Sequence, residues 1–225
     1  MPGAGQPYDA GVGDEQIGSF AVDLGDWFEA HATEVKANLE RYFLGVGGLP
    51  FDGRHFERFS AMGDPNRFVA TDVLAVEALS VGVPPDSAAR LISTEAENFN
   101  LLLRQIPTDK EMWEVPSYVL ADNGPAAKLH ARLQDLDGVG WVTAGKLLAA
   151  KRPRLIPILD DLVKKVLEPP RNRFWSTMRE QLSDEHRREQ INQVVSFPLG
   201  DVTFLRRIDV AVWMHGWSQQ HREYE

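Results

Sequence analysis

The sequence of 225 residues contains no cysteine. This absence excludes disulfide bonds, thiolate zinc sites, iron–sulfur clusters and cysteine nucleophiles. The sequence also lacks any apolar run of about 18 residues, the length that a membrane-spanning helix requires. Its first fifteen residues, MPGAGQPYDAGVGDE, have neither the basic start nor the apolar stretch of a signal peptide. We therefore expect a cytoplasmic protein with no membrane partner.

Positive charge is also scarce, because 24 Lys and Arg stand against 33 Asp and Glu, a formal net charge of −9. Nonspecific binding to nucleic acid comes mainly from Lys and Arg displacing counterions, so this balance disfavours a general polyanion binder. The segment from Lys128 to Lys165 differs, with eight Lys or Arg and four Asp, a local charge of +4. Such a run indicates either a solvated helix face or a local anion-binding surface.

Helical spacing of apolar residues dominates the chain and predicts an all-α fold. The pattern from Phe20 to Phe43 predicts one long helix, and Asp86 is placed to cap a helix that continues toward Ile106. Residues 1–18 read as a disordered lead-in, and residues 19–225 as a single helical domain with a candidate boundary between two lobes at residues 107–125. Further helices are expected at about residues 71–80, from residue 125, and at 141–150, 159–167, 174–182, 184–195 and 203–217.

A glycine turn lies between two of these predicted helices, in the segment LDGVGWVTAGKLLAAKRPRLIPILDD at residues 136–161. Gly138 and Gly140 bracket Val139, and glycine allows a positive φ or a close approach by another backbone. The N–H groups at the start of the following helix form a natural phosphate site. Carbonyl groups of the turn could hold a monovalent cation bridging to the same phosphate. A tight helical hairpin needs such glycines even without a ligand.

The longer segment 136–167 resembles the helix-hairpin-helix DNA glycosylase superfamily. In that superfamily Leu-Pro-Gly-Val-Gly is followed by Thr-Ala on the second hairpin helix and then by a catalytic Asp that starts another helix. The matching residues are Leu136, Gly138, Val139, Gly140, Thr143 and Ala144, with PILDDLVKKVL matching the acid segment. The local likeness is strongest to the adenine mismatch glycosylase branch, with which the interval from Gly140 to Asp160 also agrees. The rest of the chain resembles an actinobacterial protein family and adds no glycosylase motif.

The resemblance implies a helix-hairpin-helix DNA glycosylase-like bundle in which Asp160 is catalytic. Such a carboxylate stabilises positive charge on the sugar and orients a water molecule, after the target base has been flipped out of duplex DNA. Trp141 and Trp113 are candidates to line the base pocket. The candidate phosphate contacts are Gly138, Val139, Gly140, Thr143, Lys146, Lys151 and Arg152, with Arg154 nearby. No cofactor is implied, and the six histidines show no metal-ligand spacing.

Three departures from the superfamily pattern narrow the expected function. Asp137 replaces the usual hairpin proline and puts a negative charge beside the proposed phosphate site. Val142 stands where bifunctional enzymes carry their lyase lysine, with Lys146 one turn further on as a poor substitute, so we expect a monofunctional enzyme. The cysteine-ligated cluster of the mismatch branch cannot form.

The leading interpretation is thus a monofunctional DNA glycosylase acting on a damaged or mispaired base. One alternative is a catalytically silent DNA-binding or protein-interaction module, favoured by the net charge and Asp137. Another is an N-glycosidase for a small nucleoside-like substrate, which needs no large basic face. In the silent module, Asp160 or Asp161 would only cap a helix. An open pocket that reaches Asp160 distinguishes the enzymes from the module.

Overall fold

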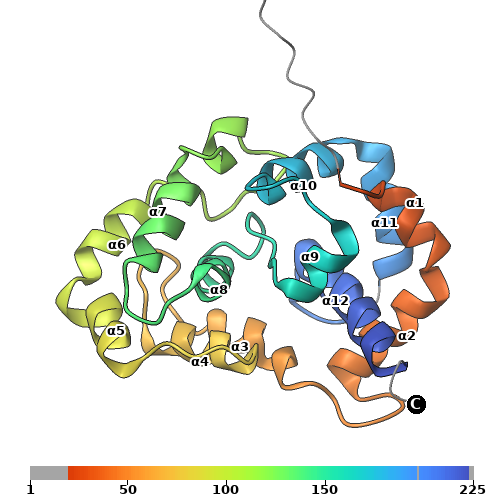
Figure 1. The fold of residues 1–225 in the computed structure, drawn as a ribbon, viewed down its shortest axis with the longest axis horizontal. Coiled ribbons are helices and arrows are strands. Elements are labelled where there is room, and N and C mark those ends of the chain that lie inside the picture. Colours follow the sequence, from red (N-terminus) through yellow and green to blue (C-terminus); the bar gives the residue numbers. More distant parts are fainter. Residues whose placement is uncertain (1–19, 197, 223–225) are drawn as a thin grey trace, which may run out of the picture.

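The computed structural model describes residues 20–196 and 198–222, so the predicted lead-in at residues 1–18 lies outside the described residues. Within the described part of the chain there are twelve α-helices and no strand, which confirms the all-α fold class (Figure 1). Among the same residues, no helix is both long enough and apolar enough to cross a membrane.

The helices follow one another with short connections. In chain order they are α1 (Leu24–Ala30), α2 (Ala32–Leu44), α3 (Phe56–Ser60), α4 (Ala70–Ala78), α5 (Pro85–Ala89), α6 (Ala96–Leu103), α7 (Pro125–Gln134), α8 (Trp141–Lys151), α9 (Asp161–Leu167), α10 (Phe174–Ser183), α11 (Glu185–Val195) and α12 (Phe204–Arg222). Two 3₁₀ turns, Asp52–His55 and Ser117–Leu120, and a π-helical turn, Arg90–Thr94, complete the described elements.

Helix α8 lies at the centre of the molecule in Figure 1, with α3, α4 and α7 packed against it. Its sequence WVTAGKLLAAK is apolar on nearly every side, and Ala144, Leu147 and Leu148 are completely buried. A helix that is apolar all round belongs in the interior of a fold. Helix α12 packs against α2 and α9 on the other side of the bundle. The glycine turn and the Asp160 segment are therefore anchored by the core.

The long helix predicted from Phe20 to Phe43 is wrong, because the chain bends at His31 and forms α1 and α2 instead. His31 has non-helical backbone angles (φ −109°, ψ 15°) and serves as the C-cap of α1 and the N-cap of α2. Its Nδ1 donates to the Trp27 carbonyl at 2.7 Å. A one-residue break leaves both apolar patterns nearly in phase, so helical spacing alone does not reveal it.

The predicted helix from Asp86 to Ile106 is also interrupted. Helix α5 passes into the π-helical turn and ends at Glu95, before α6 begins. The Glu95 carboxylate accepts hydrogen bonds from Arg90 Nε at 2.5 Å and from Arg132 Nη2 at 2.8 Å. These two ion pairs hold the break in place and tie it to α7.

Candidate functional site

The predicted hairpin is present as α7, a turn at residues 135–140, and α8. Gly138 has a φ of +73°, and a Cβ atom at this position would lie 2.6 Å from Pro84 Cγ. Ser87 Oγ donates to the Asp137 carbonyl at 2.7 Å. The turn thus rests against the start of α5, and both its backbone conformation and its packing require glycine at position 138.

Gly140 has a different role, because it is the N-cap of α8 with an ordinary extended conformation (φ −78°, ψ 176°). A Cβ atom added to Gly140 would meet no heavy atom within 4 Å, so this position faces open space. The first N–H groups of α8 have no acceptor within the helix. Val139 and Thr143, two other predicted phosphate contacts, are buried. Gly138 and Gly140 in the turn and Trp141 at the start of α8 remain exposed to solvent.

Lys151 and Arg152 are not available for the phosphate contacts predicted from the sequence. Helix α8 has 11 residues, so its last residue lies about 16 Å along the axis from the hairpin. Lys151 Nζ forms a buried ion pair with Asp72 Oδ2 at 2.6 Å and donates to the Asp64 carbonyl at 2.9 Å. Arg154 is exposed and pairs with Glu111.

The Arg152 guanidinium is 1% exposed and holds the core together from inside. Burial lowers its pKa to about 10. Its nitrogen atoms donate to five oxygens: the carbonyls of Pro65, Leu103, Ile106 and Lys151, and the Asn66 side chain. The basic run seen in the sequence is therefore largely a structural feature.

Asp160 lies directly before α9 and is its N-cap. Its Oδ1 accepts hydrogen bonds from Leu162 N at 3.2 Å and from Val163 N at 3.1 Å. These bonds explain why an acid is favoured here, and they fix the orientation of the carboxylate. Asp161 is the first residue of α9 and is exposed.

The Asp160 carboxylate also lines a cavity of about 470 Å³, which is within the size range of small-molecule sites. The cavity lies among α2, α4, α8, α9 and α12 and the turn after α4. Asp160 thus combines a capping role with access to a ligand-sized space. The polar side chains of its lining are Tyr42, Asp52, Ser80, Lys146, Asp160, Asp161, Arg206 and Asp209, and its aromatic residues are Tyr42, Phe51 and Trp213.

Asp209 on α12 is a second carboxyl group in the same cavity. It is 4% exposed; its Oδ2 accepts a hydrogen bond from Ile158 N at 2.9 Å, and its Oδ1 has no hydrogen-bond partner among the described residues. Burial raises the pKa of Asp209 to about 8. At neutral pH this side chain is a protonated acid, whose proton can be given to a bound molecule.

Arg206 forms part of the cavity wall and pairs with Glu57. Its Nε donates to Glu57 Oε1 at 2.8 Å, and its Nη2 donates to the Tyr42 hydroxyl at 2.8 Å and to the Gly53 carbonyl at 3.3 Å. Burial raises the pKa of the Tyr42 hydroxyl. This network satisfies the buried guanidinium and fixes one side of the cavity.

Lys146 points into this cavity and not toward the hairpin phosphate site predicted from the sequence. Its Nζ donates to the Leu79 carbonyl at 3.0 Å, and burial lowers its pKa. One helical turn earlier, Val142 lines the same cavity. The side of α8 that the sequence assigned to phosphate binding therefore carries an amine beside Asp160 instead.

Comparison with known proteins gives one match, to a family model described as a family of unknown function, DUF6308, over residues 35–216. This chain belongs to DUF6308. No curated protein and no solved structure matches it. The range matched by the DUF6308 model includes the hairpin, Asp160 and Asp209, so the whole cavity lies within the family's shared region.

Of the two tryptophans predicted to line the base pocket, neither reaches the Asp160 cavity in this DUF6308 member. Trp113 packs edge-on against Phe204 and lies under the Arg188 guanidinium, at 4.9 Å from the ring centroid. Trp141 is 39% exposed and lines a separate cavity of about 820 Å³ with Trp175 and Lys164. That cavity lies on the α7 and α10 side of α8.

The site residues that the sequence did not reveal come from segments distant in the chain. Tyr42, Phe51 and Trp213 supply the aromatic surface of the Asp160 cavity, and Asp209 supplies its second acid. The sequence offers one indication of Asp209, because it stands in the apolar stretch RRIDVAVWM. Burying an acid there costs free energy, so its presence indicates a structural or functional role. Its place in the same cavity as Asp160 follows only from the packing of α12 on α9.

Proposed function

We propose that the protein hydrolyses the N-glycosidic bond of a nucleic-acid base, with a damaged or mispaired base flipped from duplex DNA as the leading substrate. The observation that carries this proposal is the Asp160 carboxylate at a ligand-sized cavity that contains a second, protonated acid, Asp209. A sealed Asp160 would have favoured the silent module. The local likeness of residues 136–167 to the glycosylase superfamily supports the same chemistry.

The two acids divide the work of the reaction. As the bond between sugar and base breaks, Asp209 gives its proton to the departing base, and positive charge develops on the sugar. Asp160, which accepts hydrogen bonds from the N–H groups of Leu162 and Val163, stabilises that charge and takes the proton of the attacking water. The sugar thereby gains the hydroxyl group of the water, and the base gains a proton. Proton exchange with solvent then returns a proton to Asp209 and removes one from Asp160.

The aromatic residues of the cavity suit a planar base. Tyr42 stacks on Phe51 with ring centroids 5.3 Å apart and 10° between planes, and Trp213 meets Phe51 edge-on. Flipped bases are held by stacking on such rings and by hydrogen bonds to their edges. Lys146 and Asp209 are the donors placed at this cavity for those hydrogen bonds.

Support for DNA as the substrate comes from the hairpin and from α9. Gly140 and the start of α8 are open, and Lys164 and Lys165 are exposed on α9, next to Asp160 in sequence. Helix N-termini and lysines are common phosphate partners.

A second candidate, an N-glycosidase for a small nucleoside-like substrate, is favoured by one group of observations. Lys151 and Arg152 are buried, while the side chain of Asp137 is fully exposed at the hairpin. A small substrate would use the cavity without a large basic face. Both candidates use Asp160 and Asp209. They differ in whether the base belongs to duplex DNA or to a small nucleoside-like molecule.

The test incubates the full chain with duplexes that contain uracil, alkylated, deaminated or oxidised bases, and in parallel with free nucleosides. Free base is measured by chromatography, and abasic sites are cleaved with alkali. We expect Asp160→Asn to lose at least about a hundredfold in rate, because the charge on the sugar is no longer balanced. Asp184→Asn is the matched control and retains activity, because Asp184 caps α11 as Asp160 caps α9 and does not line the cavity.

The outcomes separate the readings. Product from duplexes supports the glycosylase, and product from nucleosides alone supports the small-substrate enzyme. No product from the wild-type chain, or equal product from Asp160→Asn, contradicts the proposal. Binding to an abasic-site analogue without turnover would leave the silent module. Strand cleavage should require alkali, since Val142 occupies the lyase position.

A further inference from the structure

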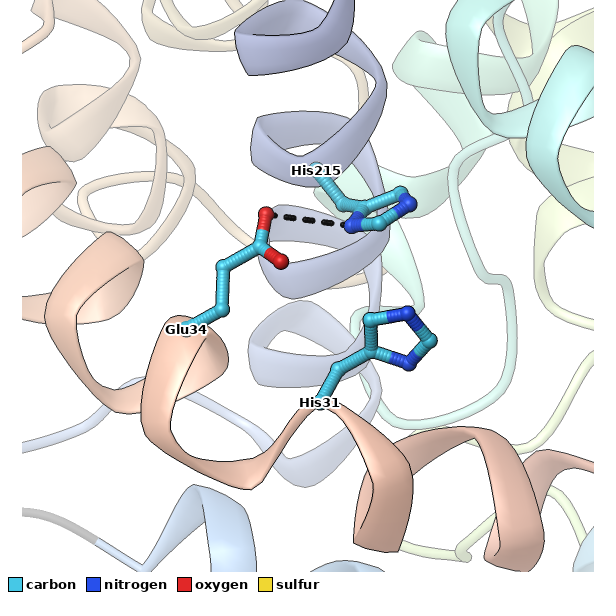
Figure 2. Close-up of side chains that lie close together, drawn as sticks. All are labelled: His31, Glu34 and His215. Carbon is cyan, nitrogen blue, oxygen red and sulfur yellow. Dashed lines mark hydrogen bonds and ion pairs between the residues drawn. The ribbon is translucent and has the colours of Figure 1, made fainter.

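Three potential metal ligands meet on the face of the bundle formed by α1, α2 and α12, away from the Asp160 cavity. They are His31 at the junction of α1 and α2, Glu34 in the first turn of α2, and His215 on α12 (Figure 2). One ligand atom from each residue lies within 4.8 Å of the other two. None of the three residues lines the Asp160 cavity.

We propose that His31, Glu34 and His215 bind a divalent transition-metal ion such as Zn²⁺. Two imidazole nitrogens and one carboxylate oxygen form a donor set that suits zinc and its neighbours, whereas Mg²⁺ and Ca²⁺ favour oxygen ligands alone. The site would clamp the junction of α1 and α2 to α12. Solvent would supply the fourth ligand, because His31 and Glu34 are only partly buried.

One of the three donor distances is already close to the distance that zinc needs. Donor atoms bound tetrahedrally at zinc–nitrogen and zinc–oxygen distances of about 2 Å lie about 3.3 Å apart. His215 Nδ1 and Glu34 Oε1 are 3.1 Å apart, and the dashed line in Figure 2 joins these two atoms. The ring centroids of His31 and His215 are 4.7 Å apart. One ring nitrogen of His31 lies within 4.8 Å of the donor atoms of Glu34 and His215.

Both imidazoles have the outer hydrogen bonds that metal-binding histidines use to fix their rings. His31 Nδ1 donates to the Trp27 carbonyl, which leaves Nε2 with its lone pair. His215 Nε2 lies 2.8 Å from Gln219 Nε2. Turning this amide places its oxygen toward the ring, so that His215 Nε2–H donates to the oxygen and Nδ1 is left to bind metal.

Trp27 holds the two rings in place before any ion binds. Its indole stacks on His31 with ring centroids 4.6 Å apart and 24° between planes, and it meets His215 edge-on at 5.2 Å. Side chains locked by packing lose little freedom when they bind an ion, so this arrangement favours affinity. The sequence did not suggest the site because Glu34 and His215 are 181 residues apart.

The chain contains a matched control in His221. His221 Nδ1 contacts the Trp217 carbonyl at 2.8 Å, and its ring stacks on Trp217 with 25° between planes, as His31 does on Trp27. In the described residues His221 belongs to no metal-ligating group. His31→Ala and His221→Ala therefore remove the same stacking and the same backbone contact, but only the first removes a proposed ligand.

The experiment uses the full chain, free of any histidine tag and dialysed against a chelator. Zn²⁺ is titrated by calorimetry, and Co²⁺ by the visible absorption of a four- or five-coordinate ion. We expect one ion per chain for the wild type and for His221→Ala. His31→Ala, Glu34→Gln and His215→Ala should each bind at least tenfold more weakly, while excess Mg²⁺ should not displace Co²⁺.

Circular dichroism checks that each variant is folded, and if the buried His215→Ala fails, His31→Ala and Glu34→Gln decide. The proposal is overturned by the absence of saturable binding to the wild type. It is also overturned if His31→Ala and Glu34→Gln bind as the wild type does, or if His221→Ala loses affinity equally. None of these readouts depends on base excision.

Discussion

Asp160 and Asp209 are the same amino acid in two environments, and the proposed reaction uses each in a separate role. Asp160 is half-buried and accepts two backbone hydrogen bonds. Asp209 is almost completely buried and accepts one, and burial raises its pKa to about 8. A buried acid with a raised pKa in the same cavity as a second carboxyl group is typical of acid–base sites.

The first prediction at the residue scale concerns activity and pH. Because Asp209 must be protonated to act as the acid, we expect base excision by the wild type to fall as pH rises above about 8. Asp209→Asn should be slower by about a hundredfold or more, because asparagine has no acidic proton to give to the base. Its rate should also not decline above pH 8, because asparagine does not ionise. Single-turnover rates across the pH range measure both effects. Wild-type activity that stays constant well above pH 8 would rule out Asp209 as the acid.

The same residue predicts how stability depends on pH. The pKa of Asp209 is about 8 in the folded state, against about 3.9 in the unfolded state. Between these values the folded state holds a proton that the unfolded state has lost, so the free energy of unfolding decreases as pH rises. From pH 6 to pH 8 the decrease due to Asp209 is about 2 kcal/mol at most. Urea denaturation at both pH values should show this decrease in the wild type and not in Asp209→Asn. Equal pH dependence of the free energy of unfolding in the two proteins would contradict the raised pKa of Asp209.

At the scale of the element, the two hairpin glycines are expected to respond differently to alanine. Gly138→Ala should destabilise the fold by roughly 1–3 kcal/mol, because a positive φ is costly for alanine and the new Cβ meets Pro84.

Gly140→Ala should leave stability nearly unchanged, since its surroundings are open. If the start of α8 holds a DNA phosphate, Gly140→Ala should instead weaken binding to an abasic-site duplex. Chemical denaturation and fluorescence anisotropy measure the two effects, and a Gly140→Ala protein that binds normally would speak against a phosphate there.

Local patterns predicted the elements around the hairpin well and long-range contacts poorly. Gly140 and Pro153 enclose α8, and its predicted range of residues 141–150 is confirmed to within one residue. The break at His31 was not predicted, because the apolar residues of the two helices keep the same spacing across it. The burial of Lys151 and Arg152 depends on acceptors up to 87 residues away, which no local pattern contains.

At the scale of the whole molecule, a net charge of −9 limits how DNA can be held. With Lys151 and Arg152 buried, only a few exposed cations such as Lys164 and Lys165 remain near the hairpin. Each phosphate contact contributes about 0.9 to the slope of log affinity against log salt. We therefore expect a slope of magnitude below about 4, measured by anisotropy in increasing KCl. A much steeper slope would show a basic surface that these contacts do not account for.

The buried guanidinium of Arg152 has a consequence for how quickly the fold forms and how long it lasts. It joins the end of α8 to the carbonyls of Leu103, Ile106 and Pro65, which precede it by 49, 46 and 87 residues. Closing loops of that length costs chain entropy before any contact is gained, so these bonds are expected to form late in folding. Interactions absent from the transition state set the unfolding rate. Arg152 should therefore slow unfolding, and so prolong the lifetime of the folded chain, without increasing the folding rate.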